Sequence, residues 1–280
     1  MKRLVLVDGY SIFFRAHFSP SNANIRNGAI YGFTRALTNI KTNPYLKHSH
    51  IAVALDTGKK TFRHTMYEKY KAQRPPCPVE LIPQFPMIRE INNILNIPSL
   101  EMEGYEADDV IATYAKRAEK EGYEVIIIGI DKDLMQLVNE TTIMYDAFKG
   151  KKILIKDVVE KWGVQPKQVL DVLSLMGDTS DNVPGVPKIG PKTAANLINE
   201  FKNINNLIDN VDKVAKQTIR ENIKKNVNDL ILSRDLIRLY EEVPLNVSID
   251  SCMAKSFNDN DVRDFLNKNT KDTKKGEFLV

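Results

Sequence analysis

Three short apolar runs in this chain each end close to an aspartate. Residues 4–7 precede Asp8, residues 51–55 precede Asp56, and residues 125–128 lie shortly before Asp131. Uninterrupted apolar runs of this length are typical of strands that a parallel sheet buries on both faces. Because parallel α/β sheets bind ligands at the carboxyl ends of their strands, we expect the three aspartates to meet at one edge.

Six more acidic residues extend this pattern: a cluster at a predicted helix start, a residue close to Asp131 and a pair in a glycine-rich loop. The nine together are Asp8, Asp56, Glu106, Asp108, Asp109, Asp131, Asp133, Asp178 and Asp181. Carboxylates gathered at one edge repel each other unless cations neutralise them. Hard divalent cations such as Mg²⁺ take oxygen ligands. We therefore predict a metal site at the carboxyl edge of the sheet.

Other roles remain open for some of these acids. Carboxylates in a first turn stabilise a helix N-terminus, which is an alternative for one or two of the acids at positions 106, 108 and 109. Asp133 is also a preferred N-cap residue for the helix predicted over residues 134–138. Three acids in four positions exceed what a helix N-terminus requires, so the metal role is favoured.

The charge balance of the chain favours a polyanionic partner. The formal net charge is only +4, from 40 basic and 36 acidic residues among 280. If the nine acids face metal ions, the 40 basic and 27 remaining acidic residues carry a net charge of +13. A basic surface around an acidic pocket suits nucleic acid, and an ordinary mixed surface is the alternative.

Several classes of protein are disfavoured. Cys77 and Cys252 match no metal-ligand spacing, which argues against zinc and a disulfide framework and indicates a reducing compartment. The first apolar run is too short for a signal peptide, and no run approaches the roughly 18 apolar residues of a membrane span. We expect a cytoplasmic monomer without membrane contact.

Alternating strand and helix patterns predict an α/β domain with a mostly parallel central sheet, flanked by helices, over residues 1–165. Strand signals then stop, and helical patterns predict a helical domain over residues 166–265, followed by a flexible tail over residues 266–280. Predicted strands cover residues 2–7, 51–55, 125–128, 141–145 and 153–155. Predicted helices cover residues 11–18, 29–40, 81–95, 106–120, 157–162, 166–176, 191–201, 213–225 and 229–240.

A basic insertion over residues 57–80 interrupts the α/β pattern. It has no long apolar period, and it carries Arg63, Lys71 and Arg74 close to Tyr70. Cations bind phosphates, and tyrosines stack on unpaired bases. A long insertion between core elements is usually functional or mobile. We expect it to contact nucleic acid, and a solvated charged helix is the alternative.

A glycine-punctuated stretch at residues 183–192 leads into a predicted helix. Gly185 and Gly190 allow backbone amides to approach a phosphate closely, and Lys188 and Lys192 add charge to the helix N-terminus. Contacts of this kind hold a nucleic-acid backbone without reading its sequence. The alternative is a plain Gly/Pro loop between helices.

Six segments, by their order and spacing, resemble the flap endonuclease superfamily, and in particular the bacterial 5′–3′ exonuclease domain of the DNA polymerase I type. They are VDGYSIFFRA at residues 7–16, TFR at 61–63, YKAQR at 70–74, EGYEADDV at 103–110, DKDLMQL at 131–137 and GDTSDNVPGVPKIGPKTA at 177–194. The resemblance spans roughly residues 1–250. It implies a PIN-like nuclease core, a basic helical arch over about residues 57–80 and a helical domain with a helix–three-turn–helix motif.

The resemblance also implies a role for each candidate residue. The nine acids fall on family acidic positions around two nearby Mg²⁺ ions, which Mn²⁺ can replace. Lys71, Arg74, Asp109 and Asp131 are the expected catalytic residues, the two aspartates as inner metal ligands. DNA contacts are implied for Arg63, Tyr70, Lys71, Arg74, Gly185, Val186, Lys188, Gly190, Lys192 and Thr193. The glycine-rich motif often holds a K⁺ ion in the family.

The chain departs from the family pattern in two respects. Ile130 stands where family members commonly have glycine before the aspartate. No polymerase sequence follows the nuclease region, so we expect a free-standing nuclease or a separately encoded partner of a DNA polymerase.

The expected function is structure-specific 5′–3′ exonuclease and flap endonuclease activity by a two-metal mechanism. Expected substrates are 5′ flaps, nicks and RNA primers, in lagging-strand replication and DNA repair. Three alternatives remain. A non-catalytic DNA junction binder would not need nine acids. A metal-dependent ribonuclease of the toxin type would be shorter and lack residues 177–194. A phosphatase for small esters would need neither DNA contact.

Overall fold

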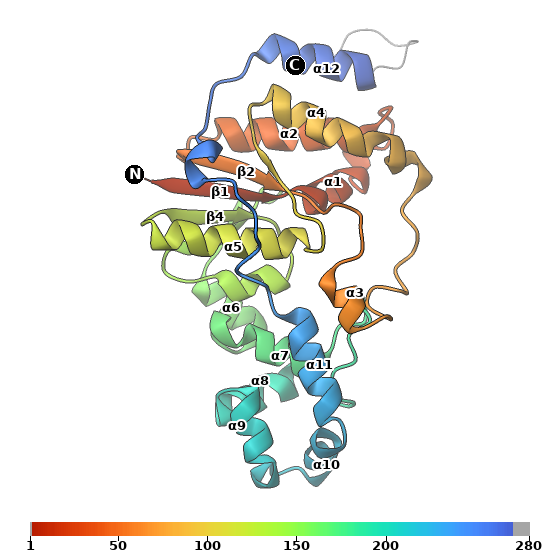
Figure 1. The fold of residues 1–280 in the computed structure, drawn as a ribbon, viewed down its shortest axis with the longest axis vertical. Helices are drawn as coiled ribbons and strands as arrows, with labels where there is room; N and C mark the ends of the chain where they lie inside the picture. Colours follow the sequence, from red (N-terminus) through yellow and green to blue (C-terminus); the bar gives the residue numbers. More distant parts are fainter. Residues whose placement is uncertain (1, 271–280) are drawn as a thin grey trace.

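A six-stranded sheet in the order β3-β2-β1-β4-β5-β6 organises the first half of the chain (Figure 1). The computed structural model describes residues 2–270. Five strands are parallel, and β6 pairs antiparallel with β5. The strands are β1 (Arg3–Asp8), β2 (His50–Ala54), β3 (Ser99–Leu100), β4 (Glu124–Ile128), β5 (Thr142–Asp146) and β6 (Lys151–Ile153). The prediction of a mostly parallel α/β sheet is confirmed.

The central strand β1 is apolar because it lies between β2 and β4 and both faces of the sheet are covered there. Val5 pairs with Ile51 of β2 and with Ile126 of β4, and Leu4 is completely buried. With this register, β1, β2 and β4 end together at one edge of the sheet. The residues that follow their last paired positions therefore gather at that edge.

Helices cover both faces of the sheet (Figure 1). One face packs against α1 (Gly9–His17), α2 (Gly28–Thr42) and α4 (Phe85–Ile94), and α12 (Asp259–Thr270) packs against α2 and α4 on the side away from the sheet. The other face packs against α5 (Ala107–Lys120) and α6 (Ile155–Trp162). The chain therefore returns at its end to the face on which it began.

The helical part extends the core beneath α5 and α6. Its helices are α7 (Val169–Met176), α8 (Pro191–Phe201), α9 (Ile204–Asp209), α10 (Gln217–Lys225) and α11 (Val227–Ile237). Single 3₁₀ turns are η1 (Pro20–Asn22), η2 (Val79–Gln84), η3 (Asp133–Leu137), η4 (Pro166–Gln168), η5 (Val211–Lys213) and η6 (Ile249–Cys252). Within residues 2–270, no helix has the length and apolarity that crossing a membrane requires.

Two expectations about local structure are wrong. The expected tail begins too early, because residues 266–270 belong to α12, where Phe265 and Val262 bury the inner face; the remainder of that tail, residues 271–280, lies outside the described residues. The expected helical arch is helical only over α3 (Phe62–Met66). The turns that follow contain Lys71 in the left-handed region, at φ 56°, which interrupts any longer helix.

Candidate active site

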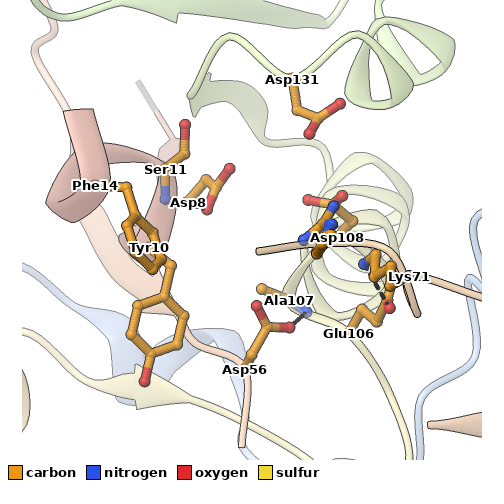
Figure 2. A pocket seen from close by; sticks show the side chains of 11 residues that line it. Asp8, Tyr10, Ser11, Phe14, Asp56, Lys71, Glu106, Ala107, Asp108 and Asp131 are labelled. Atoms are coloured by element: carbon orange, nitrogen blue, oxygen red, sulfur yellow. Dashed lines mark hydrogen bonds and ion pairs between the residues drawn. The ribbon is translucent and has the colours of Figure 1, made fainter. Parts of the chain in front are cut away.

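A pocket of about 240 Å³ lies at the carboxyl edge of the sheet (Figure 2). Its carboxylates come from the end of β1, the loop after β2, the start of α5 and the loop after β4. Residues that line it are Asp8, Tyr10, Ser11, Phe14, Asp56, Lys71, Arg74, Glu106, Ala107, Asp108 and Asp131. The three strand-end aspartates thus share one pocket, as their positions after the apolar runs predict.

Backbone amides fix the positions of these aspartates. Asp8 is the N-cap of α1, and its Oδ1 accepts a hydrogen bond of 3.1 Å from the Ser11 amide. The Asp56 Oδ1 accepts one of 2.8 Å from the Ala107 amide at the start of α5. The Asp131 Oδ1 accepts one of 2.9 Å from the Asp133 amide. Each strand end is thereby tied to the turn beside it.

The nine acids divide into two groups by their partners. In the described part of the chain, five have no ion pair with a lysine, arginine or histidine, and four do. The unpaired carboxylates are those of Asp8, Asp56, Asp108, Asp131 and Asp133. The paired ones are those of Glu106, Asp109, Asp178 and Asp181. The nine acids are therefore not equivalent in their surroundings.

Burial and mutual repulsion disfavour the charged form of the unpaired acids. Burial, with the Asp131 charge nearby, raises the pKa of Asp8 to about 7 and that of Asp133 to about 8. The same two causes raise the pKa of Asp108 well above its usual value. Burial and the Glu106 charge raise the pKa of Asp56. The charged forms of these carboxylates are therefore costly, and no ion pair within residues 2–270 offsets that cost.

The paired acids each contact a basic side chain. The Lys71 Nζ lies 2.7 Å from Glu106 Oε1, as the dashed line in Figure 2 marks. Arg74 Nη2 lies 2.5 Å from Asp181 Oδ1, and Lys132 Nζ lies 2.6 Å from Asp178 Oδ2. Burial acts to raise the pKa of Asp178, but the Lys132 and Ser180 hydrogen bonds outweigh it and lower that pKa.

Asp109 does not line the pocket, and its role as a catalytic metal ligand stays a prediction. Its Oδ2 and Oδ1 accept bonds of 2.6 and 2.7 Å from Arg63, whose side chain is only 2% exposed. The Tyr240 and Glu106 amides also donate to it. Every strong acceptor position of this carboxylate is thus taken. In the sequence, this structural role is indicated by the position of Asp109 three residues after Glu106, a spacing typical of a capping box.

Arg63, for which the sequence predicts a DNA contact, is buried in this structure. Besides Asp109, its guanidinium donates to the Leu236 carbonyl at 2.7 Å and the Arg238 carbonyl at 2.8 Å. It is a buried link between α3, α5 and the end of α11. No DNA phosphate can reach it in this conformation.

Residues 69–74, which we call the strap, are bound to the loop at residues 178–182. The Lys71 amide donates to the Asp181 carbonyl at 2.9 Å, and the Asn182 side chain donates to the Lys69 carbonyl at 2.7 Å. Tyr70, expected near an unpaired base, is only 4% exposed and donates to Glu106 at 3.2 Å. The strap thus places Lys71 and Arg74 at the pocket while it closes Tyr70 off.

The glycine-rich loop contains both structural and exposed positions. Gly185 has φ 64°, and a Cβ atom there would lie 2.3 Å from the Gly177 nitrogen. Its amide donates to Ser233 Oγ at 2.9 Å, and Val186 is 2% exposed. These two residues therefore shape the loop and do not offer a surface to phosphate. The exposed positions are Lys188, Gly190 and Lys192, with Thr193 half-buried, around an α8 start that no side chain caps.

The donor set fits a hard divalent cation. It consists of carboxylate oxygens that lack cationic partners, and the buried Asp133 Oδ1 also has no hydrogen-bond partner. In the span 2–270, no three His, Cys, Asp or Glu side chains converge closely enough to hold one ion by themselves. This arrangement suits Mg²⁺, which keeps several waters and needs only one or two direct carboxylates.

An acidic pocket at the carboxyl edge of a parallel sheet, with lysine and arginine at its rim, is the arrangement of a metal-dependent nuclease. Two family models match the chain: "5′-3′ exonuclease, N-terminal resolvase-like domain" over residues 3–163 and "5′-3′ exonuclease, C-terminal SAM fold" over residues 164–260. The chain therefore belongs to the 5′-3′ exonuclease family.

Curated relatives are DNA polymerases. DNA polymerase I of Rhizobium leguminosarum is 44% identical over 265 residues, which cover 91% of this chain and 26% of the relative. DNA polymerase I of Bacillus subtilis is 38% identical over 265 residues, which cover 92% of this chain and 30% of the relative. The chain thus spans between a quarter and a third of the length of these relatives.

Solved nuclease structures share the fold. A bacteriophage T5 flap endonuclease, in a pseudo-enzyme-product complex with DNA and metal ions, has a TM-score of 0.72 at 23% identity and covers 94% of this chain and 99% of its own. The catalytic core of Rad2 in complex with a DNA substrate has a TM-score of 0.62 at 18% identity and covers 96% and 87%. These likenesses confirm the α/β nuclease fold with its helical second part.

Proposed function

We propose that this chain hydrolyses phosphodiester bonds at 5′ flaps, nicks and RNA primers, as a structure-specific nuclease. The observation that carries the proposal is the pocket where Asp8, Asp108 and Asp131 lack a cationic partner while Lys71 and Arg74 reach its rim. A pocket of this kind attracts divalent cations and, together with its own basic side chains, a phosphodiester.

Two Mg²⁺ ions, replaceable by Mn²⁺, are proposed at this edge. Asp8, Asp108 and Asp131 would hold one, in part through its water shell, and Asp133 and Asp178 would hold the other. When bound, such ions activate water and stabilise the leaving oxygen. Asp131 is the exposed member of the set, so it is the one most accessible from the side of the substrate.

Lys71 and Arg74 are proposed to bind the scissile phosphate. They now neutralise Glu106 and Asp181, and a phosphate oxygen is an alternative acceptor of the same charge. Donation to phosphate would offset the negative charge that develops during hydrolysis. Since both side chains belong to the strap, substrate binding should move the strap relative to the loop at residues 178–182.

Duplex DNA is proposed to rest on the exposed part of the glycine-rich loop. Lys188 and Lys192 are exposed beside Gly190 at the start of α8, where partial positive charge of the helix favours phosphate. A K⁺ ion at this loop is part of the proposal. Contacts here would hold duplex of any sequence, so that substrate shape decides which bond enters the pocket.

The relatives support a proposal for the cellular role. We propose primer removal and repair alongside a DNA polymerase, by a monomeric protein in the cytoplasm. The relatives named DNA polymerase I support the pairing with a polymerase, and two free cysteines, Cys77 and Cys252, suit a reducing compartment. We also propose that the chain divides near residue 165 into a catalytic and a DNA-binding domain.

One assay tests this function. Wild-type protein is given a 5′-flap DNA labelled at its 5′ end, linear single-stranded DNA, RNA and a small phosphate ester, each with and without Mg²⁺. We expect Mg²⁺-dependent release from the flap to be at least tenfold faster than from the other three. Flap binding without cleavage would favour a junction-binding protein, and faster cleavage of RNA would favour a ribonuclease.

A further inference from the structure

The cations around the pocket are unevenly distributed. On the side of the sheet, Asp8, Asp56, Asp108 and Asp131 have no ion pair in residues 2–270. In the loop at residues 178–182, Asp178 and Asp181 each have an ion pair. Lys132 contacts Asp178, and Arg74 contacts Asp181. Arg74 comes from the strap, which substrate should displace. Lys132 comes from the loop between two carboxylates of the site itself.

Lys132 and Ser180 together satisfy both carboxylate oxygens of Asp178. Its Nζ lies 2.6 Å from Asp178 Oδ2, while Asp178 Oδ1 accepts bonds of 2.9 and 2.7 Å from the Ser180 amide and hydroxyl. The Asp178 side chain is 10% exposed, but that of Lys132 is 32% exposed. The carboxylate is therefore held in place, whereas the flexible lysine stem has a route to solvent.

Asp133, the residue after Lys132, differs from Asp178 because one of its carboxylate oxygens is unsatisfied. Its Oδ1 is buried and has no hydrogen-bond partner in the described structure. Burial and the charges of Asp131 and Asp178 disfavour the charged form of Asp133 and raise its pKa to about 8, while the Lys132 charge acts against this rise. Asp133 therefore has an unsatisfied carboxylate oxygen, whereas Lys132 occupies one oxygen of Asp178.

We propose that Lys132 is an internal counterion of Asp178, in the loop at residues 178–182. Its ammonium group occupies the Asp178 carboxylate until a divalent ion replaces it. The inference rests on the proposed metal-dependent function and deepens it. An ion bound through Asp8, Asp108 and Asp131 displaces no lysine, but an ion bound through Asp178 must compete with the Lys132 ammonium. The two metal positions therefore fill in order, first at the sheet and then, more weakly, at the loop. Lys132 is therefore a positioning residue, which acts by holding the Asp178 carboxylate.

Direct Mn²⁺ binding separates this role from a purely structural ion pair. Free Mn²⁺ is measured by electron paramagnetic resonance during titration of the full chain, without DNA, at fixed ionic strength. Lys132→Met removes the charge and keeps the stem. Lys161→Met is the matched control, because Lys161 also feels the Asp131 charge but has no ion pair with Asp178. Lys132→Arg keeps the charge, and thermal melting checks that each variant is folded.

We expect two classes of Mn²⁺ site in the wild-type protein. In Lys132→Met the weaker class should tighten about fivefold, the size of a partly exposed ion pair, while the tighter class changes less than twofold. Lys161→Met and Lys132→Arg should leave the difference between the classes unchanged. Adding Asp178→Asn to Lys132→Met should abolish the gain.

The results that would overturn the inference are distinct from those against the proposed function. Unchanged or weaker binding of the second ion by Lys132→Met, with normal wild-type binding, removes the role of Lys132 alone. Equal tightening in Lys161→Met reduces the effect to general electrostatics and also overturns it. A wild-type protein that binds no Mn²⁺ removes the metal-dependent function and this inference with it.

Discussion

Arg63 and Asp109 form a bidentate ion pair that is almost wholly enclosed, with 2% and 0% of their side chains exposed. The pair joins α3 to the first turn of α5. Through the Leu236 and Arg238 carbonyls it also reaches the end of α11. The acid next to it, Asp108, lies in the pocket instead. Adjacent carboxylates thus divide between holding the fold together and forming the site.

Replacement of either member of this pair should destabilise the protein. Asp109→Asn leaves a buried guanidinium without its counter-charge, so we expect a loss of about 3–5 kcal/mol in the free energy of unfolding. Urea denaturation of the metal-free protein measures it. Asp264→Asn on the exposed side of α12 is the control and should change stability by less than about 0.5 kcal/mol. A loss near that of the control would show that the pair is not needed for the fold.

Asp108→Asn should act in the opposite direction. Removing one of the mutually repelling pocket carboxylates is expected to stabilise the metal-free protein by roughly 1 kcal/mol. The same change should abolish most of the rise in melting temperature that Mg²⁺ gives the wild-type protein. Melting with and without Mg²⁺ checks both parts. A variant that is less stable than wild type without metal and equally stabilised by Mg²⁺ would contradict the account of the pocket.

From the sequence, the site can be predicted only where its residues follow the ends of apolar strands. Continuous apolar runs identify the three strands whose ends meet, so the shared edge of Asp8, Asp56 and Asp131 follows from the amino-acid sequence alone. The assignments of Asp108 and Asp109 depend on helix phase and on Arg63, which is distant in the chain. The pattern of three acids in four residues contains no information about that partner.

Other features of the fold could not be predicted from the sequence, because the elements are too short or too polar. Strand β3 has only two residues, Ser99 and Leu100, too few to show a period. Helix α12 is polar along most of its length, and its buried side chains depend on α2 and α4, which only the folded chain brings beside it. The glycine-rich motif indicates a tight loop, but the structural role of Gly185 is visible only from its distance to Gly177.

Gly185→Ala should destabilise the protein by about 2–4 kcal/mol, since its positive φ and the close Gly177 backbone leave no room for a methyl group. Gly190→Ala is the matched comparison, because a Cβ there meets no atom within 4 Å. We expect it to cost less than about 1 kcal/mol. Chemical denaturation of both variants is the measurement. Equal stability of the two would mean that Gly185 has no such constraint.

Lys71→Met should slow cleavage more than it weakens DNA binding. We expect single-turnover flap cleavage at saturating protein to fall about 100-fold or more, because a positive charge near the scissile phosphate is lost. Lys69→Met, in the same strap but with an exposed side chain, should retain the rate within a few fold. Fluorescence anisotropy gives the affinity of each variant for flap DNA. A Lys71→Met protein with the wild-type rate would exclude the proposed phosphate contact.

The central claim is that the unpaired carboxylates form a metal site that drives hydrolysis, and Asp131→Asn tests it most directly. Single-turnover cleavage of a 5′-flap DNA is measured across a Mg²⁺ titration for wild type, Asp131→Asn and the control Asp264→Asn, with flap affinity measured in parallel. We predict that Asp131→Asn loses nearly all cleavage at every Mg²⁺ concentration and keeps flap affinity within a few fold, while the control behaves as wild type. Wild-type turnover by Asp131→Asn in Mg²⁺ would contradict the account.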